Sequence, residues 1–299
     1  MAEKINYTTC PACKSSNIKK ALGAKDYTVS NEMFSIWECS NCTLRFTQDV
    51  PNATDIGPYY QSSAYISHSD TKEGLINRLY HVVRDITLKS KCNLVKQYTR
   101  LQKGNLLDIG AGTGAFANTM QQANWQVTGL EPDEHARLVA TNKYSLNLQD
   151  ASAIYELEAN QFDAITMWHV LEHVHDLLGY LEKFSSILKP NGQLFIAVPN
   201  YTSYDAQLYK EYWAAYDVPR HLYHFSPESM EKLASSKGFT VKAFKPMWFD
   251  SFYVSMLSEQ YKNGKGNLLK AYWNGCISNI KTLFNVKRCS SLIYVLAKR

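Results

Sequence analysis

Residues 106–114 read LLDIGAGTG, and this stretch decides the fold. An apolar run ends at Asp108, three glycines then alternate with other residues, and a helical pattern begins at Ala115. In a parallel α/β sheet, this order corresponds to a strand, a tight turn and a crossover helix. Glycine allows both the sharp turn and the close approach of a ligand to the backbone. The first N–H groups of the helix then point at that ligand. We therefore expect a cofactor at this turn.

The glycines alone leave two cofactor classes open. GAGTGA at 110–115 fits a relaxed dinucleotide-binding fingerprint. Anchored on Asp108 as DxGxGxG, the same stretch resembles motif I of the class I S-adenosylmethionine-dependent methyltransferases. A second expected strand at 126–130 ends at Glu131, whose carboxylate can accept hydrogen bonds from both ribose hydroxyls in either family.

Three later segments favour the methyltransferases. An expected strand at 145–148 leads to Asp150, FDAITMWHVLEHV at 162–174 reads as a strand followed by a helix, and LKPNGQLFIAVPN at 188–200 reads as a turn and a strand. With LDIGAGTG and LEP, this ordered series resembles the full motif set of class I methyltransferases. A dinucleotide fold is not expected to show the last two segments.

The resemblance implies a Rossmann-like α/β fold with a seven-stranded sheet. Its last two strands, expected at 238–244 and 292–297, would form an antiparallel hairpin. More distantly, the chain resembles ubiquinone O-methyltransferases and the C-methyltransferases of nucleotide-linked sugars. The implied cofactor-binding residues are Asp108, Gly110, Ala111, Gly112, Gly114, Glu131, Pro132, Asp150, Ala151, Trp168 and His169.

The string HVLEH at 169–173 also fits HxxEH, the inverted zinc-peptidase motif, with two histidines on one helix face. It begins just after a predicted strand and is common in the methyltransferases, where it needs no metal. We expect no zinc here, and Glu172 and His173 are assigned to packing and hydrogen bonding.

Four cysteines predict a metal centre near the N-terminus. Cys10 and Cys13 form one CxxC pair, and Cys39 and Cys42 form a second. Two such pairs are typical of a structural zinc ribbon, in which four thiolates close a tetrahedral site. The alternatives, disulfides or free thiols, are disfavoured because no secretion signal is visible. Ribbon strands are expected at 28–34 and 35–38.

The loop DVPRHLYHFS at 217–226 is the candidate acceptor site, because it places rings and charged groups after the fifth strand. By resemblance to the sugar C-methyltransferases, His221 is the first candidate for a catalytic base, with His169 second and a role as loop anchor left open. Arg220 and His224, with Tyr65 and His68 from the connector, are the candidate substrate-binding residues.

We expect three parts: a zinc ribbon at 1–50, a connector with a helical lid at 51–101, and a methyltransferase domain at 102–299. A helical insertion at about 248–289 either packs on the connector helix, walls an apolar substrate or forms a homodimer face. The net charge of +5 is spread along the chain, so nucleic acid is disfavoured. No apolar run is long enough to span a membrane, and a cytoplasmic location is predicted.

These features predict an S-adenosylmethionine-dependent enzyme that methylates oxygen or carbon of a small molecule, such as a sugar nucleotide, glycan or lipid precursor. Two alternatives stay open at this point. One is an RNA methyltransferase whose ribbon grips nucleic acid, and the other is a non-catalytic cofactor-binding scaffold.

Overall fold

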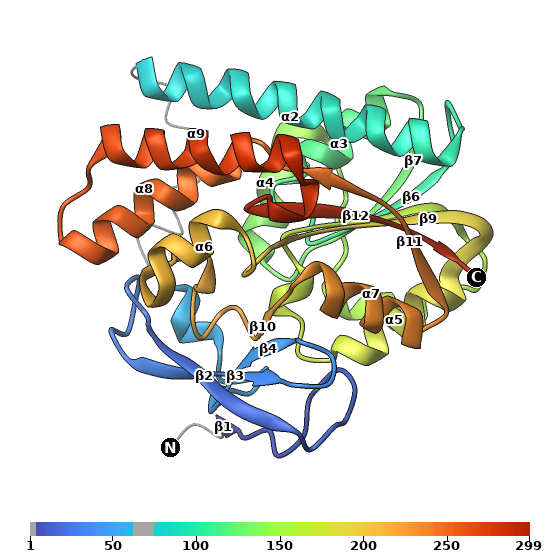
Figure 1. Cartoon of the computed structure of the whole chain (residues 1–299). Helices are drawn as coiled ribbons and strands as arrows, with labels where there is room; N and C mark the ends of the chain where they lie inside the picture. The colour runs from blue at the N-terminus through green and yellow to red at the C-terminus, as the bar shows by residue number, and fades with distance from the viewer. Residues whose placement is uncertain (1–3, 62–74) are drawn as a thin grey trace.

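The computed structural model describes residues 4–61 and 75–299. Its central sheet has the strand order β11-β12-β9-β8-β6-β7 (Figure 1). Strands β6 to β9 pair in parallel, and β12 runs antiparallel to both β9 and β11. The predicted C-terminal hairpin is therefore confirmed. The strand bounds are β6 Asn105–Ile109, β7 Gln126–Leu130, β8 Phe162–Trp168, β9 Leu188–Pro199, β11 Phe239–Pro246 and β12 Ser291–Lys298.

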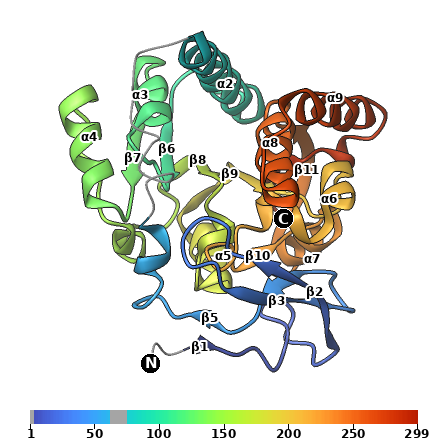
Figure 2. The same cartoon turned by 90° about the vertical axis from the view of Figure 1, so that its left-hand side faces the viewer.

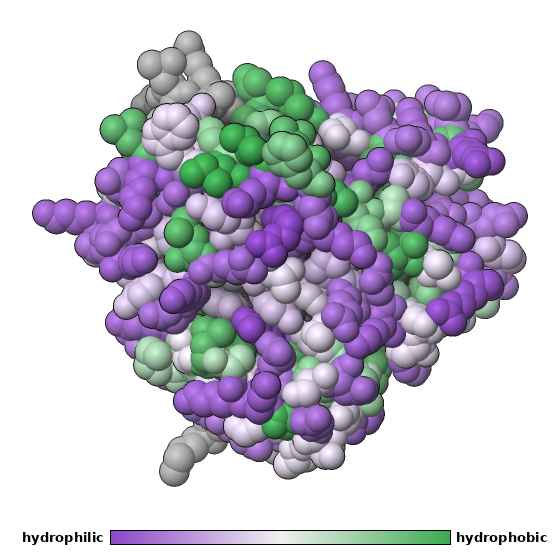
Figure 3. Space-filling model, in the orientation of Figure 1, coloured by the Kyte–Doolittle hydropathy of each residue, from purple (hydrophilic) through white to green (hydrophobic). Residues whose placement is uncertain are grey.

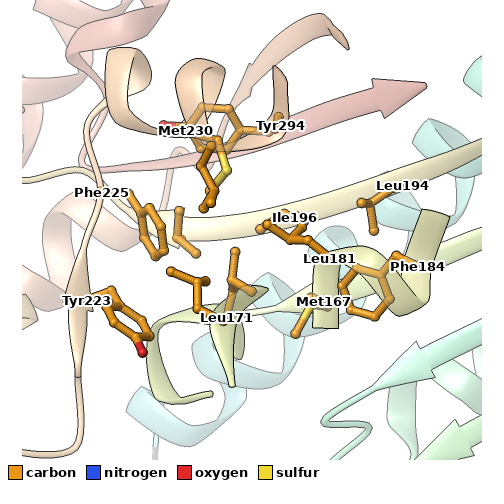
Figure 4. Packing of buried hydrophobic residues seen from close by; sticks show 14 of the residues in the cluster. Met167, Leu171, Leu181, Phe184, Leu194, Ile196, Tyr223, Phe225, Met230 and Tyr294 are labelled. Atoms are coloured by element: carbon orange, nitrogen blue, oxygen red, sulfur yellow. The ribbon is translucent and has the colours of Figure 1, made fainter. Parts of the chain in front are cut away.

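Helices cover both faces of this sheet. Parallel strands carry apolar side chains on both faces, and these side chains must be covered from both sides. One face carries α2 (Leu75–Thr99), α3 (Ala115–Gln122) and α4 (Glu134–Tyr144), and the other carries α5 (Leu177–Ile187) and α7 (Pro227–Ser236). Figure 4 shows the core beneath the sheet, where Ile196 of β9 and Phe184 of α5 lie in one cluster with Phe225.

The described part of the chain gives this sheet six strands, so the expected seven-strand count is not confirmed. Helix α4 extends to Tyr144, and Ser145 then takes a left-handed conformation with φ 56°. Leu146 and Leu148 pack against Ala140 in a small apolar cluster. Only Gln149 is left to pair with the sheet edge, through an isolated bridge to Leu130. The strand expected at 145–148 is therefore wrong.

The N-terminal ribbon forms a second sheet with the order β10-β4-β3-β2. Its strands are β2 Ile18–Lys25, β3 Met33–Cys39, β4 Arg45–Thr47 and β10 Tyr223–His224, and a separate pair joins β1 Lys4–Ile5 to β5 Val50–Pro51. The prediction of a strand at 28–34 is wrong for most of that range. Asp26 accepts hydrogen bonds from the backbone N–H groups of Thr28 and Ser30, which closes a turn there.

The ribbon and the methyltransferase-like domain are physically continuous. Strand β10 comes from the candidate acceptor loop, yet it pairs with ribbon strand β4. The buried cluster beneath the central sheet also takes in Cys39, Leu44 and Phe46 of the ribbon. The acceptor loop is thus held between the ribbon and the sheet.

The insertion is helical, as predicted. It contains α8 (Asp250–Asn263) and α9 (Leu268–Phe284), followed by the short turn η6 (Val286–Arg288). Figure 2 shows both helices on the side of the molecule away from α3 and α4, next to α6 (Tyr204–Tyr209). Among the described residues, no helix is both long and apolar enough to cross a membrane.

The remaining short elements are 3-10 turns: η1 Gly57–Tyr60, η2 Ala151–Glu156, η3 Leu171–His173, η4 Lys210–Tyr212 and η5 Ala214–Tyr216. The helix expected straight after β8 is therefore only one turn, and α5 begins later, at Leu177. His169 and His173 do not share a helix face, because His169 lies before that turn with φ 59°.

Candidate functional site

The loop after β6 has the backbone that the glycine pattern predicts. Gly110, Gly112 and Gly114 all have positive φ, between 54° and 81°. A Cβ on Gly110 would lie 2.3 Å from Val170, so the turn after β8 packs directly on this loop. A Cβ on Gly112 would meet no described atom within 4 Å. Gly112 therefore presents its backbone to open space, as a ligand-binding turn requires.

Acidic side chains follow β7 and the bridge at Gln149. Glu131 is buried, and its carboxylate accepts hydrogen bonds from the N–H groups of Gly112 (2.7 Å) and Asp133 (3.0 Å). Burial raises the pKa of Glu131. Asp150 begins the η2 turn, accepts from Ser152 and contacts Arg137 at 3.3 Å. The Ser152 hydrogen bonds and the Arg137 charge lower the pKa of Asp150.

The remaining predicted cofactor residues surround the same loop. Ala111 bonds through its N–H to the carbonyl of Leu130 (3.0 Å), and the Pro132 carbonyl accepts from Arg137 (2.9 Å). Ala151 is the first residue of η2, directly after Asp150.

A buried acid, Asp108, and a half-buried base, Lys91, lie near the loop. Asp108 accepts a hydrogen bond from Thr166 (2.7 Å), and burial raises its pKa to about 7. The Lys91 ammonium lies 4.4 Å from the ring centre of Trp168. Burial lowers the pKa of Lys91 to about 8, against the attraction of Asp250 and Asp108. Trp168 Nε1 is buried and has no hydrogen-bond partner in the described part of the chain.

His169 lies between two carboxylates at the carboxyl end of β8. Its Nε2 is 3.1 Å from Asp250 at the start of α8, and its Nδ1 is 3.3 Å from Glu172. Burial alone would lower the pKa of His169, but these two acids raise it to about 10. The ring is therefore an imidazolium at neutral pH.

Glu172 also lies close to two further groups, His173 and His221. One ligand atom each of Glu172, His173 and His221 lies within 4.8 Å of the others. The ring centres of the two histidines are 4.6 Å apart, edge to face. Glu172 is fully buried, and its Oε2 has no hydrogen-bond partner among the described residues. Such a set is able to relay a proton or to hold a divalent cation.

Hydrogen bonds fix the orientation of both histidine rings. His221 Nδ1 lies 2.9 Å from the Ala215 carbonyl, so Nδ1 carries the hydrogen and Nε2 is the basic nitrogen. His173 Nδ1 lies 3.0 Å from the Arg220 carbonyl and 3.1 Å from the Tyr60 hydroxyl. Burial and the neighbouring His221 lower the pKa of His173 to about 4.

The structure places Arg220 and His224 in packed surroundings. The Arg220 guanidinium bonds Asp217, Asp26 and the Tyr59 carbonyl, and the residue is 1% exposed. His224 bonds the Thr47 hydroxyl, and burial lowers its pKa well below the usual range. Both side chains join the ribbon to the acceptor loop. Tyr65 and His68 lie outside the described residues.

The four ribbon cysteines converge as predicted, with their sulfur atoms within 4.8 Å of one another. The Sγ atoms are 3.5 Å apart for Cys10 and Cys42, and 3.6 Å apart for Cys13 and Cys39. A tetrahedral zinc site with Zn–S bonds of about 2.3 Å separates sulfurs by about 3.8 Å. The cluster therefore fits a zinc ion with little adjustment.

A methyltransferase-domain family model matches residues 86–243, slightly more than half of the chain. The chain belongs to the methyltransferase domain family. The matched range runs from within α2 through the glycine loop and the acceptor loop into β11. It contains every predicted site residue except the four ribbon cysteines, Tyr65 and His68.

Curated relatives of this methyltransferase-domain chain include ubiquinone biosynthesis O-methyltransferases. The human mitochondrial protein is 29% identical over 182 residues, covering 54% of this chain and 49% of its own length. The Histophilus somni protein is 34% identical over 121 residues, covering 36% of this chain and 50% of its own length. The chain thus spans about half the length of these relatives.

Solved structures confirm the fold of the methyltransferase domain. Magnesium protoporphyrin IX methyltransferase from Synechocystis PCC 6803 superposes with a TM-score of 0.52 at 13% identity. The match covers 81% of this chain and 97% of that chain. The class I methyltransferase fold expected from the motif series is therefore correct.

Sequence reasoning missed several residues at this methyltransferase site. Lys91, Asp250 and Tyr60 reach it from α2, α8 and the connector, far from the motifs in sequence. The connector and insertion carried only helical or aromatic patterns, which do not say where a side chain will meet the sheet. For Glu172 the sequence predicted only packing and hydrogen bonding.

Proposed function

We propose that this chain transfers a methyl group from S-adenosylmethionine to an oxygen or carbon of a small-molecule acceptor, such as a sugar nucleotide, glycan or lipid precursor. The observation that carries the proposal is the Gly112 turn, which leaves open space beside Glu131, together with the unpartnered Trp168 Nε1. These groups follow neighbouring parallel strands, at the edge where open α/β sheets bind ligands. The O-methyltransferase relatives support transfer to oxygen.

The residues present fit an adenosyl cofactor. Gly110, Gly112 and Gly114 would approach its amino acid part, Glu131 would accept from its ribose, and Asp150 with Ala151 would lie beside its base. Trp168 Nε1 is a buried hydrogen-bond donor without an acceptor among the described residues, and a bound ligand would supply one. When bound, S-adenosylmethionine supplies a methyl group activated by a positively charged sulfur.

His221 is the proposed base. Its Nδ1 is held by the Ala215 carbonyl, so Nε2 would accept the proton of an acceptor hydroxyl or carbon acid. The buried Glu172 carboxylate nearby would stabilise the resulting imidazolium. His169 suits a different role, because a cation held between Asp250 and Glu172 cannot take another proton. Its charge would stabilise a developing negative charge on the acceptor.

The ribbon is proposed to hold structural zinc through Cys10, Cys13, Cys39 and Cys42. Four protein ligands close the coordination sphere, so this metal would stabilise the fold and take no part in chemistry. The metal would still affect His221 indirectly. Ribbon strand β4 pairs with β10 of the acceptor loop, so a stable ribbon would hold that loop in place.

Calorimetric titration with S-adenosylmethionine tests the cofactor site. Gly112→Ala places a methyl group where the ligand is proposed to approach, and we expect affinity to fall by ~10-fold or more. Gly238→Ala is the matched control, since Gly238 also has positive φ and no described atom within 4 Å of a built Cβ. Equal affinities for the two variants would contradict the cofactor site.

Transfer of a radioactive methyl group to panels of sugar nucleotides, lipids and RNA tests the acceptor and the base. His221→Ala is expected to keep cofactor affinity and to lower turnover by ~100-fold or more. His135→Ala, at an exposed position on α4, serves as the control. Unchanged turnover in His221→Ala would remove its assignment as the base. Labelling of RNA alone would replace the small-molecule proposal.

A further inference from the structure

Helix α9 presents its apolar side chains to the outside of the molecule. Leu269, Trp273, Leu283 and Phe284 are 79%, 66%, 72% and 88% exposed, and Leu268 is 65% exposed. Positions at this spacing share one broad face of a helix. An amphipathic helix of a globular domain normally turns such a face inward, so this face needs a partner.

The inward face of α9 is small and polar, which fixes the orientation of the helix. Asn274 donates to the Tyr209 hydroxyl (2.8 Å), and Ser278 donates to Asp205 (2.9 Å). A Cβ on Gly275 would lie 2.5 Å from the Phe252 ring, so the helix packs closely on α8 at this point. Rotating α9 to bury its leucines would break these buried hydrogen bonds.

Helix α2 also carries exposed apolar side chains. Val82 and Ile86 of α2 are 54% and 51% exposed. Figure 3 shows hydrophobic residues gathered in the upper part of the molecule, over the region that α2 and α9 occupy in Figure 1. We call the apolar side of α9, formed by Leu268, Leu269, Trp273, Leu283 and Phe284, the α9 face.

Positive charge surrounds the α9 face. The stretch 262–288 contains six lysines and arginines and no aspartate or glutamate. Lys265 precedes α9, Lys281 lies in its last turn, and Arg288 follows the helix. Lys270 in the first turn pairs with Glu259 (3.1 Å), and Lys287 after the helix pairs with Glu231 (3.1 Å). Aromatic rings, long cationic side chains and leucines on one helix are typical of helices that lie in a membrane interface.

We propose that the α9 face docks on an anionic lipid surface, with α9 lying parallel to it. A second copy of the chain fits less well, because a two-fold contact would bring two acid-free, cation-rich stretches together. An anionic headgroup layer neutralises the same charges. Helix α8 packs on α9 and supplies Asp250 to His169, so α8 connects the docked helix to the candidate active site. The inference does not depend on methyl transfer.

Sedimentation of the full chain with phosphatidylcholine vesicles, with and without phosphatidylglycerol, tests the proposal. We expect binding to the anionic vesicles and a loss of binding at high salt. Leu269→Asp combined with Phe284→Asp should weaken binding by ~10-fold or more, because both side chains leave the apolar layer.

The matched control is Met33→Asp combined with Leu138→Asp, at positions 67% and 54% exposed outside the α9 face. We expect this control to bind vesicles within about twofold of the wild type. Circular dichroism checks that both variants are folded. Failure of the wild type to bind anionic vesicles, or equal binding by the two double variants, would overturn the proposal. The proposal would also be overturned if the wild type forms a dimer that does not bind vesicles and if only the Leu269→Asp, Phe284→Asp variant is monomeric.

Discussion

His169 and His173 flank the same buried carboxylate, Glu172, yet their surroundings shift their pKa values in opposite directions. His169 faces Asp250 as well as Glu172, and its pKa rises to about 10. His173 faces the His221 ring, a hydroxyl and a carbonyl, and its pKa falls to about 4. Four positions apart in sequence, one ring is a fixed cation and the other is neutral.

The two sides of Glu172 also depend on different parts of the chain. The His169 side is completed by the insertion, through Asp250, and by α2, through Lys91. The His173 side is completed by the acceptor loop and the connector, and the ribbon holds both in place. Each side can therefore be disturbed without direct contact with the other.

Loss of the zinc proposed for the ribbon should give the largest effect, and this effect should fall on the His173 side. Cys39→Ser is expected to lose the bound zinc and to lower the melting temperature by roughly 10 °C or more. Elemental analysis measures the metal, and calorimetry measures the melting temperature. Because β4 pairs with β10, turnover should fall while cofactor affinity stays near that of the wild type.

Cys276→Ser is the control, since Cys276 lies on α9 outside the metal cluster. It should retain zinc and stability. Equal loss of cofactor affinity and turnover in Cys39→Ser would show that the ribbon supports the whole domain, and the two sides of Glu172 would no longer be separable.

Arg220→Met should give the next largest effect. The change leaves Asp26 fully buried without its ion pair, and it also removes the guanidinium that Asp217 contacts at 2.6 Å. Breaking one partner of a buried pair typically costs ~3–5 kcal/mol, which urea unfolding measures. Arg288→Met, at a surface position beside Gln207, should change stability by less than ~0.5 kcal/mol.

The same variant also tests the substrate role predicted for Arg220. A stable Arg220→Met protein with weakened acceptor binding would favour that role. A large loss of stability would instead identify the residue as the tie between the ribbon and the acceptor loop.

The parts of the site that could be predicted are those built from contiguous sequence. The glycine loop, Glu131 and the two CxxC pairs each follow from local rules: a required backbone angle, a strand end, or a ligand spacing. The contribution of Lys91 and Asp250 to the His169 side could not be predicted. Helix periodicity shows which face of a helix is apolar, but it does not show which residues that helix will contact. The failed strand at 145–148 shows the same limit, because Leu146 and Leu148 pack against Ala140 of α4 and their apolar pattern does not reveal that partner.

Asp250→Asn should have the smallest effect on folding and should act on the His169 side alone. Losing one of its two carboxylates should lower the pKa of His169 from about 10 toward its ordinary value of 6.5. NMR titration of the imidazole resonances measures this change. His173, with a pKa of about 4, should titrate as in the wild type.

The opposite pKa shifts of the two histidines also predict opposite pH dependences of folding stability. The raised pKa of His169 stabilises the fold fully below pH 6.5, and this contribution is lost as pH rises through about 10. The lowered pKa of His173 stabilises the fold above pH 6.5, and this contribution is lost as pH falls toward 4. Asp250→Asn should therefore reduce only the first contribution. Asp163→Asn, which removes an acid paired with Lys189 away from the site, should leave both histidines unchanged. If both histidines moved together in Asp250→Asn, Glu172 would couple the two sides into one titrating unit.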